Sequence, residues 1–116
     1  MRGRLGDKVR LQHALEAIEI IESYVLDADF EKFLSNDMLR DACIRQLQVI
    51  GEACGKISTE LRTQHSDIPW RQIVGLRIIV VHQYFGIDEK VIWDVIRGDL
   101  PAFKKRLFQI ISNIEL

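Results

Sequence analysis

Three side chains near residue 80 are suited to phosphate chemistry: Arg77, His82 and Tyr84. They surround Ile78–Val81, four β-branched apolar residues of the kind that usually goes to a core. An arginine presents a fixed fork of donors to phosphate oxygens, and a histidine exchanges a proton near neutral pH. The Arg-x4-His spacing therefore indicates phosphoryl chemistry. The alternative is a buried arginine and histidine that only satisfy backbone carbonyls at a helix end.

A helical conformation would bring these groups within reach of one another. Arg77 and Tyr84 would share one stripe of the helix, and His82 would lie about 140° around it from Arg77. The long guanidinium could then approach this imidazole, or one on a neighbouring helix or a second subunit. No carboxylate cluster or cysteine stands beside the motif, which also suits phosphate chemistry. We expect no metal and no cofactor at this site.

Length and composition place the chain among globular proteins. Its 116 residues are 47% hydrophobic and 28% charged, which predicts one domain over residues 1–116 and excludes disorder. The net charge of −1 argues against a surface that clamps nucleic acid throughout, while a local basic site remains possible. The longest apolar run is Ile78–Val81, so we expect no membrane span, and without a visible secretory signal we expect a cytoplasmic protein.

The two cysteines, Cys43 and Cys54, are expected to be structural. Within one helix they would lie about 16 Å apart, too far for a disulfide. No Cys/His cluster has the spacing of a zinc site. They are interpreted as small buried apolar residues in a reducing compartment.

Apolar residues recur at three-to-four spacing along most of the chain, which predicts helices. We expect them over residues 7–26, 37–56, 70–84, 88–97 and 99–113, with short turns near 30–34 and 58–60 and a loop over 62–68. Ile78–Val81 could also form a buried strand, but no partner strand is evident. The sequence thus predicts an all-α fold, an antiparallel four- to five-helix bundle.

Capping residues mark the expected helix starts. Gly6-Asp7 should start and cap the first helix, Asn36 or Asp37 the second, Ser58 a short turn and Asp88 the fourth.

Glycines mark other expected boundaries. Gly86 should end the third helix, and Gly98 should stop the fourth before Asp99 starts the last. Gly51 and Gly55 lie inside the second helix, where each costs about 1 kcal/mol relative to alanine. A close crossing of another helix at these glycines is the expected compensation.

Several sequence blocks in fixed order resemble the HepT-like branch of the HEPN superfamily, the toxin partners of minimal nucleotidyltransferases. The resemblance spans nearly the whole chain. The matching blocks are Lys8-Val9-Arg10-Leu11, Glu16-Ala17-Ile18, Asp41-Ala42-Cys43-Ile44-Arg45, Val49-Ile50-Gly51-Glu52-Ala53, Ile68-Pro69-Trp70, Gly75-Leu76-Arg77, His82-Gln83-Tyr84-Phe85-Gly86-Ile87-Asp88, Val91-Ile92-Trp93 and Asp99-Leu100-Pro101.

This resemblance implies a HEPN-like bundle that forms a homodimer or higher oligomer, with two Arg-x4-His motifs facing one cleft. It implies a metal-independent endoribonuclease that acts on RNA as the toxin of a type VII-like toxin–antitoxin pair. Arg77 and His82 would be the catalytic pair. The cognate minimal nucleotidyltransferase antitoxin would silence the toxin by adding AMP to Tyr84.

The chain departs from this family at two positions. Ile78 follows the motif arginine where the family usually has a polar residue, most often Asn, and Ser66 stands where proline is common. Ile78 removes a hydrogen-bonding group beside the expected cleft and puts full RNase activity in question. It favours an alternative function, a non-catalytic helical module that binds a nucleotide or a nucleotidyltransferase. A purely structural dimer is the third interpretation.

Overall fold

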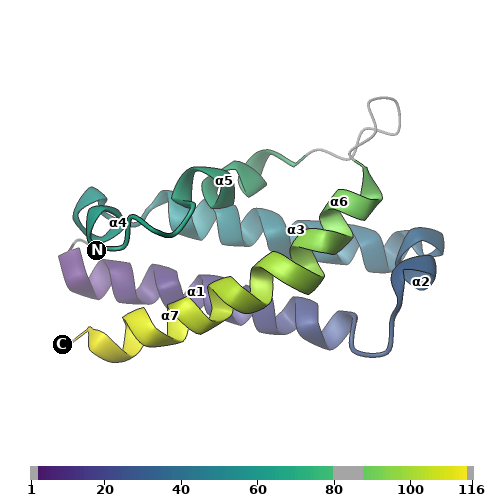
Figure 1. Cartoon of the computed structure of the whole chain (residues 1–116), viewed down its shortest axis with the longest axis horizontal. Helices are drawn as coiled ribbons and strands as arrows, with labels where there is room; N and C mark the ends of the chain where they lie inside the picture. Colours follow the sequence, from purple (N-terminus) through teal and green to yellow (C-terminus); the bar gives the residue numbers. More distant parts are fainter. Residues whose placement is uncertain (1–2, 80–87, 115–116) are drawn as a thin grey trace.

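The computed structural model describes residues 3–79 and 88–114 (Figure 1). The helices are α1 (Gly3–Tyr24), α2 (Phe30–Ser35), α3 (Asp37–Gly55), α4 (Thr59–Gln64), α5 (Trp70–Gly75), the 3-10 turn η1 (Leu76–Ile78), α6 (Glu89–Asp94), the π-helical segment η2 (Val95–Asp99) and α7 (Leu100–Asn113). The described residues contain no strand, so the expected all-α fold is confirmed.

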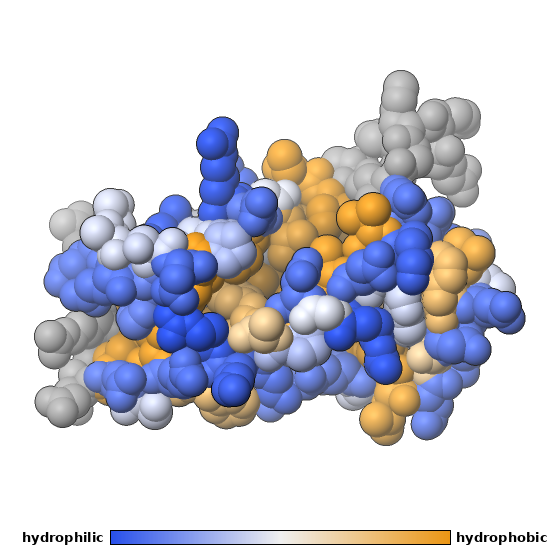
Figure 2. Space-filling model, in the orientation of Figure 1, coloured by the Kyte–Doolittle hydropathy of each residue, from blue (hydrophilic) through white to orange (hydrophobic). Residues whose placement is uncertain are grey.

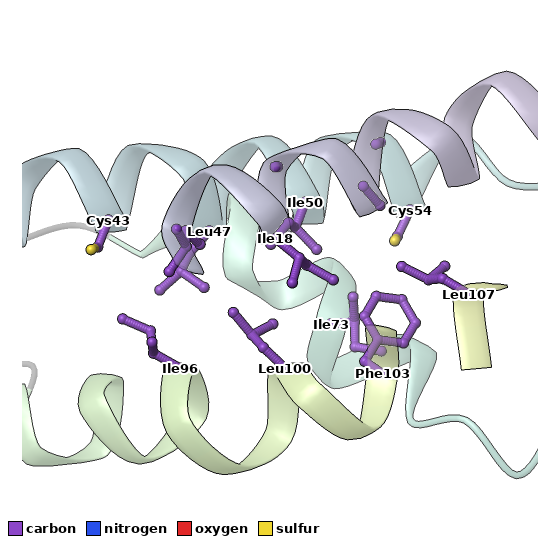
Figure 3. Packing of buried hydrophobic residues seen from close by; sticks show 14 of the residues in the cluster. Ile18, Cys43, Leu47, Ile50, Cys54, Ile73, Ile96, Leu100, Phe103 and Leu107 are labelled. Carbon is purple, nitrogen blue, oxygen red and sulfur yellow. The ribbon is translucent and has the colours of Figure 1, made fainter. Parts of the chain in front are cut away.

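Two long antiparallel helices, α1 and α3, form the base of the bundle (Figure 1). The continuous run from α6 to α7 crosses them diagonally, and α5 lies along α3. Apolar side chains of α1, α3, α5 and α7 meet between these helices, among them Ile18, Leu47, Ile73 and Leu100 (Figure 3). No helix within the described ranges is long and apolar enough to cross a membrane.

The short helix α2 covers one end of this core. Its Phe33 is fully buried and packs on Trp93 of α6, with 5.0 Å between ring centroids. The short helical turn expected here is confirmed. Leu34, which shares the expected apolar spacing, is 47% exposed instead.

Capping side chains start three helices where the sequence predicts them. Asn36 accepts a hydrogen bond from the Leu39 amide at the start of α3. Ser58 and Asp88 cap α4 and α6 in the same way. Such caps satisfy amides that have no partner within the helix. α4 continues to Gln64, however, so the loop expected from residue 62 begins later.

The prediction that Gly6 and Asp7 start and cap the first helix is wrong, because α1 already begins at Gly3 and ends at Tyr24. Asp7 is only 6% exposed, and its carboxylate accepts hydrogen bonds from the Ser58 amide at 2.8 Å and the Ser58 hydroxyl at 2.6 Å. A buried carboxylate requires such partners. Asp7 therefore joins the start of α1 to the start of α4.

The prediction that Gly98 stops a helix is also wrong. Helical backbone runs without interruption from α6 through η2 into α7 (Figure 1). In η2 the Leu100 amide donates to the Val95 carbonyl, five residues earlier, which is the wider π-helical pattern. Pro101 follows directly and has no amide to donate. The widened turn lets the helix continue across a proline that would break a regular one.

The third expected helix, residues 70–84, is shorter than predicted. Helix α5 ends at Gly75, η1 continues to Ile78, and Ile79 has extended backbone with φ −64° and ψ 112°. β-branched residues lose side-chain freedom in a helix, which disfavours continuation here. Tyr84 and the expected stop at Gly86 lie outside the described residues.

Candidate functional site

Of the three residues that the sequence singles out, the structure describes Arg77. It lies in η1, directly after α5, and its side chain is exposed. His82 and Tyr84 lie outside the described residues. Arg77 is therefore not the buried arginine of the alternative interpretation. It forms no ion pair with any residue of the described ranges.

The backbone of η1 lies directly on α3 at Gly51. A Cβ atom at Gly51 would overlap the Arg77 backbone nitrogen, and it would lie 3.0 Å from both the Arg77 Cα and the Leu76 carbonyl carbon. Only a residue without a side chain permits this approach. The close crossing predicted from the two glycines is thus confirmed at Gly51.

Gly55, one turn further along α3, faces the side chain of Arg77. A Cβ atom there would lie 3.8 Å from Arg77 Nη1 and 3.6 Å from Val74 Cγ1. The guanidinium therefore extends along α3 toward its carboxyl end. The partial negative charge at that end favours a cation.

A second arginine reaches the same end of α3. Arg62 of α4 donates from Nη2 to the Cys54 carbonyl at 2.8 Å, while its Nε atom is buried and has no hydrogen-bond partner among the described residues. Arg62 and Arg77 thus meet consecutive residues, Cys54 and Gly55, from different parts of the chain. The sequence offers no signal for Arg62, because the contact depends on how α4 folds back on α3.

Gln48 of α3 is another residue that the sequence analysis missed. Its Nε2 atom donates to the Ile79 carbonyl at 2.5 Å, across 31 residues of sequence. Its position gave a usable signal, because Gln48, Gly51 and Gly55 recur at three- and four-residue spacing on one face of α3. A polar residue on the glycine-bearing face is well placed to bind the backbone that crosses there.

Apolar surface borders Arg77. Ile78, the next residue, is 71% exposed. Figure 2 shows apolar side chains on the surface where α5 ends, and they continue into the space between α5 and the α6–α7 run. Part of this surface is a groove of about 380 Å³ between α5 and α7, with Leu76, Val95 and Phe103 in its wall and the ion pair of Arg106 and Asp67 at its edge.

The cysteines are buried and form no disulfide, as the sequence predicts. Burial raises the pKa of Cys43 to about 11. Burial likewise raises the pKa of Cys54 to about 12, with Arg62 opposing part of the rise. Both thiols are therefore neutral near pH 7 and unsuited to nucleophilic chemistry.

Comparison with known proteins supplies the family. The chain is 35% identical over 108 residues to a Methanocaldococcus jannaschii protein named "Gamma-glutamylcyclotransferase and putative RNase", covering 93% of this chain and 49% of that protein. A "Putative RNase" of the same organism is 38% identical over 100 residues, covering 86% of this chain and 92% of the relative. The probable ribonuclease HepT of Thermococcus cleftensis is 38% identical over 94 residues, covering 81% and 86%.

This chain thus spans about half the length of the first relative and most of the other two. No solved structure gives a significant match. The family described as Ribonuclease HepT-like matches residues 14–110, a range that includes α3, η1 and the whole Arg-x4-His motif. The chain belongs to the HepT-like ribonuclease family.

Proposed function

We propose that this chain is a metal-independent endoribonuclease, the toxin of a toxin–antitoxin pair that acts in the cytoplasm, with Arg77 and His82 as its catalytic pair. The main support for the proposal is that Arg77 is exposed and free of ion pairs with the described residues, in a chain of the HepT-like family. Its backbone is also fixed against Gly51. An arginine held in this way can bind a phosphate without first breaking a salt bridge.

The reaction follows from the chemistry of the two side chains. His82 takes the proton of the ribose 2′-OH, and the 2′-oxygen attacks the adjacent phosphorus. Arg77 stabilises the negative charge that develops on the phosphoryl oxygens. A second His82, from the other copy in a dimer, gives a proton to the departing 5′-oxygen. The products are a 2′,3′-cyclic phosphate and a 5′-hydroxyl, and the need for the 2′-OH restricts the enzyme to RNA.

The proposed antitoxin is a minimal nucleotidyltransferase that transfers AMP from ATP to the Tyr84 hydroxyl, with release of pyrophosphate. Tyr84 follows His82 by two residues. The added phosphate would compete with the RNA phosphate for Arg77, and the attached nucleoside would obstruct the approach of RNA.

The proposed active form is a homodimer or a higher oligomer. Ile78 is 71% exposed directly beside Arg77, and an exposed apolar residue next to a catalytic arginine is well suited to contact with a second copy. Sedimentation at micromolar concentration should show at least a dimer. A monomer alone would contradict the two-histidine mechanism.

The same exposed Ile78 favours a second candidate function. An apolar side chain where the family usually carries a polar one could serve to dock a nucleotidyltransferase, with Arg77 binding a nucleotide. The chain would then be a non-catalytic binding module.

Cleavage of RNA by purified protein separates the two candidates. Wild type should yield 2′,3′-cyclic phosphate ends, and Arg77→Ala and His82→Ala should each lose activity, by roughly 10²–10⁴-fold for the acid–base group. Circular dichroism should show unchanged helix content in both variants. Activity that survives either substitution would overturn the catalytic assignment, whereas an inert wild type that binds a nucleotidyltransferase would establish the module.

A further inference from the structure

The turn that carries Arg77 has little support of its own. η1 is three residues long, and the hydrogen bond that closes it runs from the Ile79 amide to the Leu76 carbonyl at 3.2 Å. Short 3-10 turns have poorer hydrogen-bond geometry than α-helices. Its position must therefore come from contacts with the rest of the bundle.

Two residues of α3 supply such contacts. Gly51 meets the backbone of Leu76 and Arg77 and so determines how closely the turn can approach. Gln48, one helical turn earlier, donates from its side-chain amide to the Ile79 carbonyl. The glycine contact limits only the distance between the two segments. The hydrogen bond is directional and also limits sliding and rotation of the turn.

We propose that Gln48 is a positioning residue that holds the 3-10 turn so that the Arg77 guanidinium is aimed for phosphate binding. This inference rests on the proposed function, since it gives Gln48 a role in the same reaction. Gln48 needs no contact with RNA for this role. Small displacements of a catalytic group can cost about a hundredfold in rate, so one hydrogen bond at the end of the turn is enough to matter.

The test compares Gln48→Met with Gln46→Met. Methionine keeps the approximate length of glutamine but has no N–H donor. Gln46 is also half-buried on α3, and no hydrogen bond of its side chain appears within the described ranges. Two quantities are measured for each variant: the kinetic constants for RNA cleavage, and the exchange rate of the Ile79 amide proton, which closes η1.

For Gln48→Met we expect kcat to fall by roughly tenfold to a hundredfold with little change in KM or in melting temperature. We also expect the Ile79 amide to exchange at least several-fold faster, and Gln46→Met to behave like wild type. A merely structural role would lower the melting temperature instead and leave kcat of the folded fraction unchanged.

The proposed function can fail separately. If wild type and Arg77→Ala are equally inert toward RNA, the RNase proposal is wrong, and faster Ile79 exchange in Gln48→Met would still show that Gln48 holds the turn. If kcat and Ile79 exchange are the same in Gln48→Met and Gln46→Met, the positioning role of Gln48 is overturned.

Discussion

Gly51 of α3 and Arg77 of η1 are in backbone-to-backbone contact, and a methyl group at Gly51 would overlap the Arg77 amide nitrogen. A glycine of α3, the helix on which η1 packs, thus determines where the motif arginine lies. Gly55, only four residues away, has ordinary van der Waals room for a methyl group beside Val74 and Arg77. The two glycines provide a matched pair for experiment.

Gly51→Ala should destabilise the protein by about 1–3 kcal/mol, because the backbone of η1 must move away from α3. Gly55→Ala should be neutral or should stabilise by up to about 1 kcal/mol, because alanine has the higher helix propensity and the space exists. Urea unfolding of both variants measures the difference. Equal stabilities would mean that α3 and η1 do not approach so closely in solution.

Ile78→Asn should raise RNA cleavage if wild type is weakly active. The substitution introduces a donor and an acceptor beside Arg77, at a side chain that is 71% exposed and so tolerates the change without a cavity. Initial rates on a single-stranded RNA measure the effect, with Arg77→Ala in the same background as the control. No gain over an inactive wild type would favour the binding-module function.

A cognate nucleotidyltransferase, supplied with ATP and magnesium, should add AMP to Tyr84 and abolish cleavage. The phosphodiester that links AMP to Tyr84 carries a negative charge, and Tyr84 is only seven residues from Arg77 in the sequence. This charge should oppose the binding of RNA. Mass spectrometry of the co-expressed protein locates the modification, and Tyr84→Phe serves as the control that should resist silencing. AMP found only elsewhere, or a Tyr84→Phe protein that the partner's catalysis still neutralises, would exclude this switch.

Cys43 and Cys54 should resist alkylation in the folded protein at pH 9. An ordinary thiol with a pKa of 9.0 is half ionised there, whereas Cys43, with a pKa of about 11, should be only about 1% thiolate, and Cys54 less. Reaction with iodoacetamide should therefore be slow until the protein is unfolded in urea, when both cysteines react. Fast labelling of the native protein would show that α3 opens readily.

Much of this fold could be predicted from local sequence. The three-to-four periodicity of apolar residues located the main helices, and capping by Asn36, Ser58 and Asp88 was predicted correctly. These features depend on residues within one or two turns of each other, so sequence determines them directly. The glycines at 51 and 55 also predicted a close crossing, since an interior helix glycine needs a compensating contact, and the structure shows that crossing at Gly51.

Other features depended on residues that are distant in sequence. The local pattern predicted a continuous helix from Trp70 to Tyr84, yet helical backbone there ends at Ile78. It also predicted a helix break at Gly98, yet the helix continues through η2. A long-range hydrogen bond accompanies the early end of the helix after Trp70, because the Ile79 carbonyl accepts from the side chain of Gln48, 31 residues earlier. Local propensity differences of under 1 kcal/mol per residue are readily outweighed by such contacts.

The candidate site, like the fold, has some features that local sequence predicts and others that only the tertiary structure shows. Residue type and spacing singled out Arg77, His82 and Tyr84, the family resemblance supplied the role predicted for each, and these roles stay predictions. Only the tertiary structure showed that Arg77 is exposed, that its backbone lies on Gly51 and that Gln48 binds the end of its turn. Each of these facts depends on which face of α3 meets η1. That choice is made by packing of the whole core rather than by any segment of the chain.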